Sequence, residues 1–281
     1  MADPCWQDPQ AALARIRQRI DDLDRQILAL VSERAGCAQQ VAEVKAAMGE
    51  AGQYYRPERE AQVLRRVIER NPGPVSDPDM ARLFREIMSI CLALESPLTV
   101  AFPELPGGAG LGALRKQFGA GVEARVMASV AAVCQAVEAG ECHYGMVPLE
   151  TPAGEGVAHA LDLFVASPLL ICGEVRLNRQ RQRFLVVGKV PVRPSGQDLT
   201  SVLVTMANRP GSLHELLAVP ARHGVNIQHI ESRPGPGDGH QVFFIDLQGH
   251  REEAPMGRTL EELTAAATSL KILGSYPVSV L

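Results

Sequence analysis

Three basic residues near the N-terminus, Arg17, Arg34 and Lys45, lie in one stretch that no proline interrupts. If this stretch is a helix, Arg34 and Lys45 share a face, because eleven residues are close to three whole turns. Arg17 lies 28 residues before Lys45, which is roughly 42 Å along a straight helix. It cannot join a small-molecule site with Lys45 in the same chain. Either Arg17 is a surface residue, or an antiparallel partner helix brings it to the site of another subunit.

The composition limits what such a site can hold. The net charge of -4 gives no general attraction to nucleic acid or to an anionic membrane, so any anion must be bound by a local basic cluster. The six cysteines contain no Cys-x-x-Cys pair, and the seven histidines have no metal-ligand spacing. We therefore expect neither a metal nor a cofactor, and neither nucleic acid nor membrane as a partner.

The sequence predicts a soluble cytoplasmic protein. No apolar run approaches the roughly 20 residues that span a bilayer, and residues 1–10 lack the basic flank and apolar stretch of a secretory signal. Reduced thiols are the simplest interpretation of the scattered cysteines.

The elements that must position the basic residues are three helices. Apolar residues recur at steps of three and four from Pro9 to about Ala47, which predicts one long amphipathic helix. A second helix is expected from Pro57 to Asn71, with proline in its first turn. Ser76 caps a third, and Ser96-Pro97 closes this all-α domain, which we assign to residues 1–96.

Two further domains follow in a multidomain chain. Residues 97–190 alternate strand-like and helical patterns, which indicates an α/β domain with parallel-strand character. Tyr144–Pro148 and Pro168–Cys172 are predicted to be buried strands, and Phe184–Val187 another strand. Residues 191–281 show a βαββαβ order, which predicts a ferredoxin-like α+β domain whose second helix spans Leu260–Leu270.

The first segment resembles the helical chorismate mutases. The resemblance is carried by the run from Leu13 to Arg34, by Val44-Lys45, by Tyr55-Arg-Pro-Glu-Arg-Glu60 and by the helix Ala81–Glu95. It is most like the mutase part of bacterial P-proteins, the fused chorismate mutase–prephenate dehydratases with a C-terminal ACT domain. It implies an isomerase that converts chorismate to prephenate in phenylalanine and tyrosine biosynthesis.

The resemblance also implies residue roles. The protein would be an interlocked homodimer in which Arg17 of one chain completes the pocket of the other. Arg34 and Arg59 would bind the substrate carboxylates, and Glu60 its hydroxyl. Lys45 and Glu95 would be the catalytic groups at the ether oxygen of the breaking bond. The substrate-binding set is completed by Arg56, where some relatives carry an acid, and by Cys91, a wall position where some carry serine.

These roles suit a pericyclic reaction without a covalent intermediate. Arginine clamps hold the flexible dianion in its reactive conformation, and donors at the ether oxygen stabilise the charge that grows there. Glu95 can donate only when protonated, because a carboxylate is an acceptor. We therefore expect a raised pKa for Glu95 in the occupied pocket, caused by desolvation and by the developing anion.

The middle segment resembles a prephenate dehydratase domain that is truncated and degenerate. Tyr144–Glu150, Leu161–Phe164, Ile171–Val175 and Arg183–Gly188 carry the likeness. The family's hydroxyl-bearing turn is here Gly107-Gly-Ala-Gly110, its polar Glu-Asn-Ser/Thr stretch is Glu150-Thr-Pro152, and its catalytic threonine is Gln182. Seven residues between Val175 and Arg183 leave no room for the second lobe. We predict no dehydratase activity.

The C-terminal segment resembles the ACT domains of this family, which implies L-phenylalanine as an effector at a subunit interface. Gly211 permits a tight turn before a helix whose amides can meet a carboxylate. A ligand-free module that promotes dimerisation is the alternative. The signature residues are Asn208, Gly211, Ser212, Leu213, Glu231, Ser232, Arg233 and Pro234.

Three other interpretations stay open. An active bifunctional mutase–dehydratase is opposed by the missing lobe and by Gln182. A non-catalytic dimer that senses an amino acid is opposed by the joint presence of the basic residues and Glu60. An amino-substituted chorismate could replace chorismate, because Glu60 or its neighbours could accept an amine.

Overall fold

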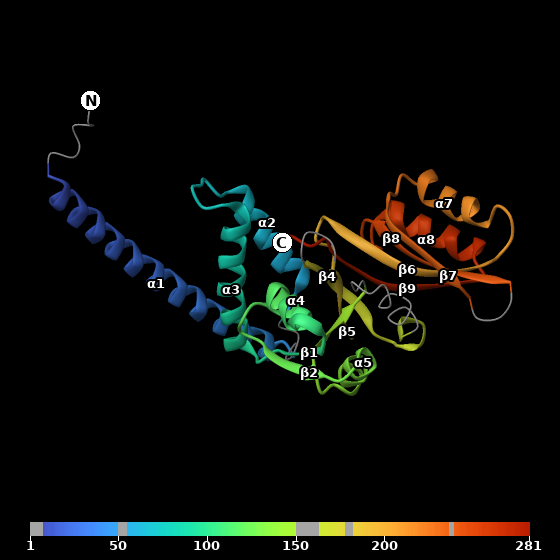
Figure 1. The fold of residues 1–281 in the computed structure, drawn as a ribbon, viewed down its shortest axis with the longest axis horizontal. Coiled ribbons are helices and arrows are strands. Elements are labelled where there is room, and N and C mark those ends of the chain that lie inside the picture. The colour runs from blue at the N-terminus through green and yellow to red at the C-terminus, as the bar shows by residue number, and fades with distance from the viewer. Residues whose placement is uncertain (1–7, 50–54, 150–162, 178–181, 236–238) are drawn as a thin grey trace, which may run out of the picture.

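The structure, a computed structural model, describes residues 8–49, 55–149, 163–177, 182–235 and 239–281. Three N-terminal helices form a helical domain, a five-stranded sheet A forms a middle domain, and a four-stranded sheet B forms a C-terminal domain. Figure 1 shows the helices at one end of the molecule and sheet B at the other, with sheet A between them. The predicted fold class is confirmed.

The long helix α1 (Pro9–Ala47) begins at Asp8, whose carboxylate accepts hydrogen bonds from the backbone nitrogens of Gln10 and Ala11 at 3.0 and 3.1 Å. Its packing partner is α3 (Asp77–Glu95). The N-terminal half of α1 reaches beyond the rest of the molecule in Figure 1. Its large apolar residues are therefore exposed within a single chain.

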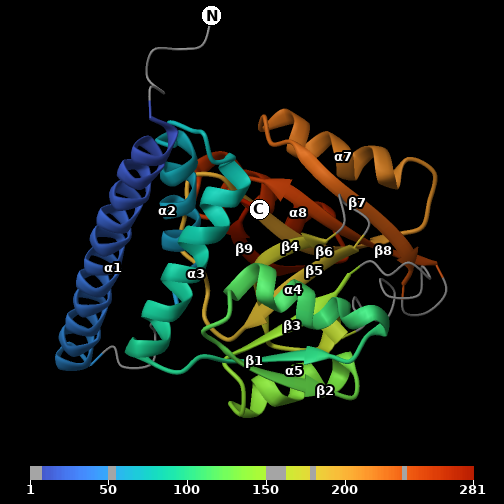
Figure 2. The same cartoon turned by 60° about the vertical axis from the view of Figure 1, so that its left-hand side comes forward.

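The other two helices pack against each other beside α1, as Figure 2 shows. Pro57 occupies the first turn of α2 (Pro57–Glu69), and the Ser76 hydroxyl caps α3. α2 is also tied to the chain that precedes sheet B, because the Arg65 guanidinium donates to the carbonyls of Ser195 and Gln197 at 3.2 and 2.9 Å.

Sheet A has the strand order β2-β1-β3-β5-β4. β1 pairs in parallel with β2 and β3, whereas β5 pairs antiparallel with β3 and β4. Alternate residues of each strand face opposite layers, so that Met146 packs toward α4 and Val147 toward α5. The elements are β1 (Thr99–Pro103), α4 (Ala109–Phe118), β2 (Glu123–Met127), α5 (Val130–Ala139), β3 (Tyr144–Pro148), β4 (Leu170–Leu177) and β5 (Gln182–Gly188).

Sheet B has the order β7-β8-β6-β9, all antiparallel, which is the ferredoxin-like arrangement that the sequence predicts. One face carries α7 and α8, and the other packs against sheet A on the side of α5. The elements are β6 (Asp198–Ala207), α7 (Ser212–Arg222), β7 (Ile227–Pro234), β8 (His240–Gln248), α8 (Ala254–Ala266) and β9 (Ser269–Pro277).

The two sheets meet closely along β4 and β9. Gly274, with a φ of +156°, lies where an added Cβ would stand 2.2 Å from the carbonyl oxygen of Ile171. Nearby, the buried Arg183 guanidinium binds Glu174 at 2.9 Å, Asp246 at 2.5 Å and the Tyr276 hydroxyl at 3.1 Å. A buried ionic network thus joins the middle and C-terminal domains.

Two expectations about elements are wrong. β4 and β5 are antiparallel, because a short connection joins neighbouring strands and leaves no crossover. The second helix of the C-terminal domain spans Ala254–Ala266, and Leu270 belongs to β9, where it pairs with Val204.

Candidate active site in the helical domain

A pocket of about 510 Å³ lies between the three N-terminal helices. Every residue that the sequence assigns to the mutase site, apart from Arg17, lines it. α1 contributes Arg34, Cys37, Ala38, Val41 and Lys45; the start of α2 contributes Tyr55, Arg56, Arg59, Glu60 and Val63; and α3 contributes Met88, Cys91, Leu92 and Glu95.

Helical periodicity explains how distant residues share this pocket. The pocket residues of α1 and α3 recur at steps of one, three or four, so each helix presents one face. Arg56 is the N-cap residue of α2, and Arg59 and Glu60 lie in its first turn. The pocket is therefore built from three amphipathic helix faces together with Tyr55 and Arg56, which directly precede α2.

The charges in the pocket suit a small dianion. Four basic residues, Arg34, Lys45, Arg56 and Arg59, face two acids, Glu60 and Glu95. Burial raises the pKa of the Glu95 carboxyl, and the charges of Lys45 and Arg34 partly offset that rise. Glu95 therefore lies close to both cations, and its environment favours the protonated form more than water does.

Glu60 has a partner that the sequence prediction missed. Its Oε1 lies 3.1 Å from Nε of Arg85, and both side chains are largely buried. Arg85 occupies the buried face of α3 together with Ala81 and Ser89, four residues to either side. The sequence could have pointed to Arg85, because a charged residue at the centre of a helical face that is predicted to be buried requires a partner.

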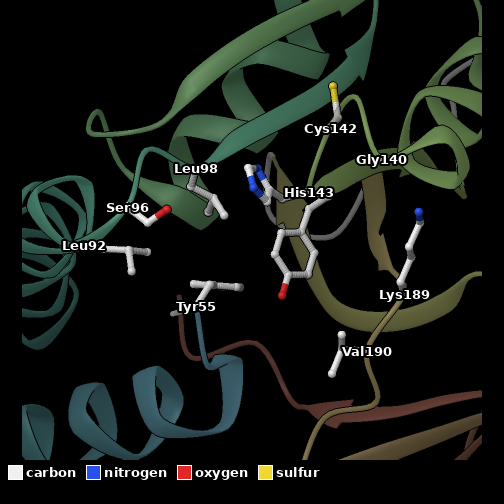
Figure 3. Close-up of a pocket in the computed structure, with 10 residues that line it drawn as sticks. Tyr55, Leu92, Ser96, Leu98, Gly140, Cys142, His143, Lys189 and Val190 are labelled. Atoms are coloured by element: carbon white, nitrogen blue, oxygen red, sulfur yellow. The ribbon is translucent and has the colours of Figure 1, made fainter. Parts of the chain in front are cut away.

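A second hollow, of about 190 Å³, lies behind Tyr55 at the border with the middle domain. Tyr55 and Leu92 line both pockets, so they form a common wall. The Lys189 ammonium points toward Gly140, while the His143 ring lies by Leu98 (Figure 3), and Nδ1 of His143 accepts a hydrogen bond from the Thr99 nitrogen at 3.0 Å. Because these two groups do not converge, the charge-rich pocket is the better candidate site.

Arg17 lies outside the pocket, exposed on the projecting half of α1. The continuous helix keeps it far from Lys45, as the sequence predicts. Within one chain it is a surface residue.

The dehydratase-like motif residues that the structure describes are spread over several elements of the middle domain. Gly107 and Gly108 form a turn before α4 and have positive φ values, and Gly110 packs against Pro103. Gln182 begins β5, with four residues between it and the end of β4, and Arg183 is 2% exposed and fully engaged. The stretches Glu150–Pro152 and Leu161–Asp162 lie outside the described residues.

The signature residues of the C-terminal domain lie in two places. Gly211, with a φ of +92°, caps α7, beside buried Ser212 and exposed Leu213, and Asn208 donates its backbone hydrogen to the carbonyl of Gly239 at 2.8 Å. Glu231, Ser232, Arg233 and Pro234 lie on the edge strand β7. Arg233 and Pro234 line a hollow of about 550 Å³, which none of the other signature residues lines. One chain therefore does not gather them into a single site.

None of the described helices is both long enough and apolar enough to cross a bilayer.

Comparison with known families assigns each domain. Residues 16–96 match the model of chorismate mutase type II, residues 111–189 that of prephenate dehydratase, and residues 200–265 that of the ACT domain.

A curated relative matches nearly the whole chain. The bifunctional chorismate mutase/prephenate dehydratase of Stutzerimonas stutzeri is 36% identical over 359 aligned positions, which cover 96% of this chain and 98% of the relative. Since 96% of 281 residues is about 270, about 90 of the 359 positions contain no residue of this chain.

Two solved structures resemble 64% of this chain. One is GqqA, described as a novel type of quorum-quenching acylase, with 28% identity, 95% of its chain covered and a TM-score of 0.59. The other is the prephenate dehydratase of Streptococcus mutans, with 25% identity, 98% of its chain covered and a TM-score of 0.54. Taken with the end-to-end match to the bifunctional relative, these findings place the chain in the bifunctional chorismate mutase/prephenate dehydratase family, with a truncated dehydratase domain.

Proposed function

We propose that this protein is a chorismate mutase that converts chorismate to prephenate. The observation that carries the proposal is the pocket in which Arg34, Lys45, Arg59, Glu60 and Glu95 come together from three helices. A protein that only sensed an amino acid would not need this set in its helical domain. The type II mutase match over residues 16–96 supports the same activity.

In this proposal the basic residues select the reactive conformation of the substrate. Arg34 and Arg59 bind the two carboxylates, and Glu60 accepts a hydrogen bond from the hydroxyl. Arg56 adds positive charge to the wall, and Cys91, 2% exposed, shapes it. Holding a flexible dianion in its compact form removes much of the entropic part of the barrier.

Lys45 and Glu95 act on the bond that breaks. As the C–O bond lengthens, negative charge grows on the ether oxygen, and donors fixed there stabilise the transition state more than the ground state. Lys45 donates as a cation. Glu95 donates as a carboxylic acid, which agrees with the upward shift of its pKa by burial.

The working form in this proposal is a homodimer with shared sites. The apolar residues of the projecting half of α1 recur at steps of three and four, and all of them are at least 40% exposed: Leu13, Ile16, Ile20, Leu23, Ile27 and Leu30. Such a stripe is typical of a helix that packs along a partner. An antiparallel partner helix would also bring Arg17 to the other chain's pocket.

The middle domain is proposed to lack dehydratase activity. Four residues join β4 to the antiparallel β5, so no second lobe is inserted there. Gln182 stands where the catalytic threonine is expected, and the neighbouring Arg183 is committed to Glu174 and Asp246. Without a facing lobe, prephenate would have no enclosed site in which to lose water and carbon dioxide.

The C-terminal domain is proposed to bind L-phenylalanine across a dimer interface. Support comes from the ACT match over residues 200–265 and from the exposed turn at Gly211 that precedes α7. The separation of this turn from β7 within one chain requires a second subunit for a complete site. Calorimetric titration with phenylalanine tests binding, and mutase assays with and without it test coupling.

One experiment decides the main proposal. The purified protein is incubated with chorismate, substrate loss is followed by absorbance, and products are identified by mass spectrometry. We expect prephenate and no phenylpyruvate, and we expect Lys45→Met to abolish turnover. Phenylpyruvate formed from added prephenate, and lost on changes in residues 97–190, would show an active dehydratase. A product only from an amino-substituted chorismate would reassign the substrate.

A further inference from the structure

We propose that Arg85 is a positioning residue of the mutase pocket, through which the truncated middle domain holds Glu60 in place. This inference rests on the proposed mutase function. Arg85 does not line the pocket; it lies behind Glu60, with its Nε 3.1 Å from Oε1 of that carboxylate. Its own side chain is 8% exposed and that of Glu60 is 14% exposed. Oε2 of Glu60 is left to accept the substrate hydroxyl.

The other side of the Arg85 guanidinium is held by the middle domain. Its Nη1 donates to the carbonyl oxygen of Lys116 at 2.6 Å. Lys116 lies in the last turn of α4, where the exposed carbonyls carry the negative end of the helix dipole. The Lys116 ammonium in turn donates to the Arg176 carbonyl on β4 at 2.7 Å. Arg85 therefore spans from a pocket acid to the scaffold of sheet A.

The surrounding contact leaves Arg85 little freedom to move. On the same helix, Glu86 accepts a hydrogen bond from the backbone nitrogen of Ala120, and Ser89 accepts one from that of Gly121, both at 2.9 Å. An added Cβ at Gly121 would stand 2.5 Å from the Ser89 carbonyl oxygen. The turn after α4 is thus fastened to α3 at two residues that follow Arg85 within one helical turn.

The charge of Arg85 also sets the ionisation of Glu60. Burial raises the pKa of the Glu60 carboxyl, and Arg85 offsets part of that rise. Without Arg85, more of Glu60 would be protonated at a given pH, and a protonated carboxyl is a weaker acceptor for the substrate hydroxyl. The other charged groups around Glu60 include Arg56 and Arg59 from its own segment, Arg34 and Lys45 on α1, Glu95 on α3 and Glu174 on β4. The uncharged titratable side chains there include Tyr55, Cys37, Cys91 and Cys172.

The test compares Arg85→Gln with Arg82→Gln in the full chain. Arg82 is the matched control, because it lies on the same helix, is 66% exposed and pairs with Asp79. For Arg85→Gln we expect KM for chorismate to rise about tenfold, with kcat little changed, because the hydroxyl contact is made before and during the reaction. The increase should grow as pH falls, as Glu60 becomes protonated. Arg82→Gln should behave like the wild type.

A double variant separates positioning from general damage. If Arg85 acts through Glu60, adding Arg85→Gln to Glu60→Gln should change KM no further. An equal KM increase in both backgrounds, or an Arg85→Gln variant with the KM and pH profile of Arg82→Gln, would overturn the proposal. Wild-type protein that does not convert chorismate would refute the mutase function itself, and this inference with it.

Arg85→Lys keeps the proposal testable if Arg85→Gln does not fold. The ammonium preserves the charge beside Glu60 but cannot span both partners as the planar guanidinium does. We expect a raised KM with the pH profile of the wild type. A folded Arg85→Lys protein with unchanged KM would contradict the bridging role.

Discussion

At the scale of single residues, the proposed chemistry of the pocket depends on how burial changes the pKa values of two carboxyl groups. Glu60 and Glu95 both have carboxyl pKa values raised by burial, yet the proposed reaction needs them in opposite states. Glu60 has Arg85 at ion-pair distance, which favours its anion, whereas Glu95 is influenced by Lys45 and Arg34, which are proposed to bind the substrate as well. Once a dianion occupies those cations, their effect on Glu95 weakens and the protonated form is favoured.

The first prediction concerns the pH dependence set by Glu95. Because Glu95 must donate and its pKa is raised, kcat/KM should be highest below that pKa and fall by about tenfold per pH unit above it. Glu95→Gln keeps a donor that does not titrate, so its profile should be flat and should exceed the wild type at alkaline pH. Glu69→Gln, an exposed change on α2, should leave the profile unaltered. A wild-type rate constant that stays flat from mildly acidic to alkaline pH would refute the role of Glu95.

At the scale of elements, α1 serves two purposes along its length. Its C-terminal part contributes Arg34 and Lys45 to the pocket of its own chain. Its N-terminal part leaves an apolar stripe uncovered, which costs solubility unless another surface buries it. A single helix of 39 residues can reach across a dimer in this way because it is continuous and rigid.

The second prediction tests that stripe. Ile20→Glu places a charge at the centre of the stripe and should convert the protein from dimer to monomer, with loss of mutase activity, because a buried unpaired charge is strongly unfavourable. Gln18→Glu introduces the same acid on the opposite face of α1 and should retain both the dimer and the activity. Light scattering after size-exclusion chromatography measures the mass. A monomeric wild type, or a dimeric Ile20→Glu protein, would contradict the arrangement.

At the scale of the whole molecule, contacts at two borders join the domains. The helical domain contacts the middle domain through Arg85 and the chain before sheet B through Arg65. The middle and C-terminal domains share a buried network centred on Arg183 and a tight strand contact at Gly274. The truncated domain thus has a structural role that does not depend on dehydratase chemistry.

The third prediction is the cost of breaking that network. Arg183→Met leaves the buried carboxylates of Glu174 and Asp246 without their cation and should lower the free energy of unfolding by about 3–5 kcal/mol. Arg176→Met removes a half-exposed partner of the same Glu174, 3.6 Å away, and should cost less than about 1 kcal/mol. Thermal and denaturant unfolding of both variants compares the two costs. Equal stability of the two would show that the network is not needed.

The fourth prediction concerns shared active sites. Arg17→Ala and Lys45→Met should each be inactive alone, but their co-expression should restore about a quarter of the wild-type rate, because half of the dimers are mixed and each has one intact site. Arg34→Ala with Lys45→Met is the control: both changes lie in one chain's own pocket, so no mixed dimer has an intact site. Recovery in the control as well, or in neither pair, would show that Arg17 does not act across the dimer.

Errors in the predicted elements have physical causes. Parallel character was expected for the middle domain because its strands read as buried apolar runs; it holds for β1 with β2 and β3 but not for β4 and β5. Their two faces are covered, one by α4 and the other by α5 and sheet B, and such burial produces the same run in either direction. The helix predicted for Leu260–Leu270 was displaced because its last apolar residue pairs in a strand, where tertiary contacts outweigh helical spacing.

The sequence by itself determined the three domain types, the helix that carries Arg34 and Lys45, and the residue types of the pocket, because helical spacing and short motifs are local properties of the chain. Only the tertiary structure decided which buried groups support the pocket and join the domains. Arg85, Arg183 and Arg65 are ordinary basic residues in the sequence, and their roles depend on partners at Lys116, Asp246 and Gln197. The role of a buried charge depends on the groups that the fold brings within a few ångströms of it, and the spacing of residues along the chain does not predict those partners.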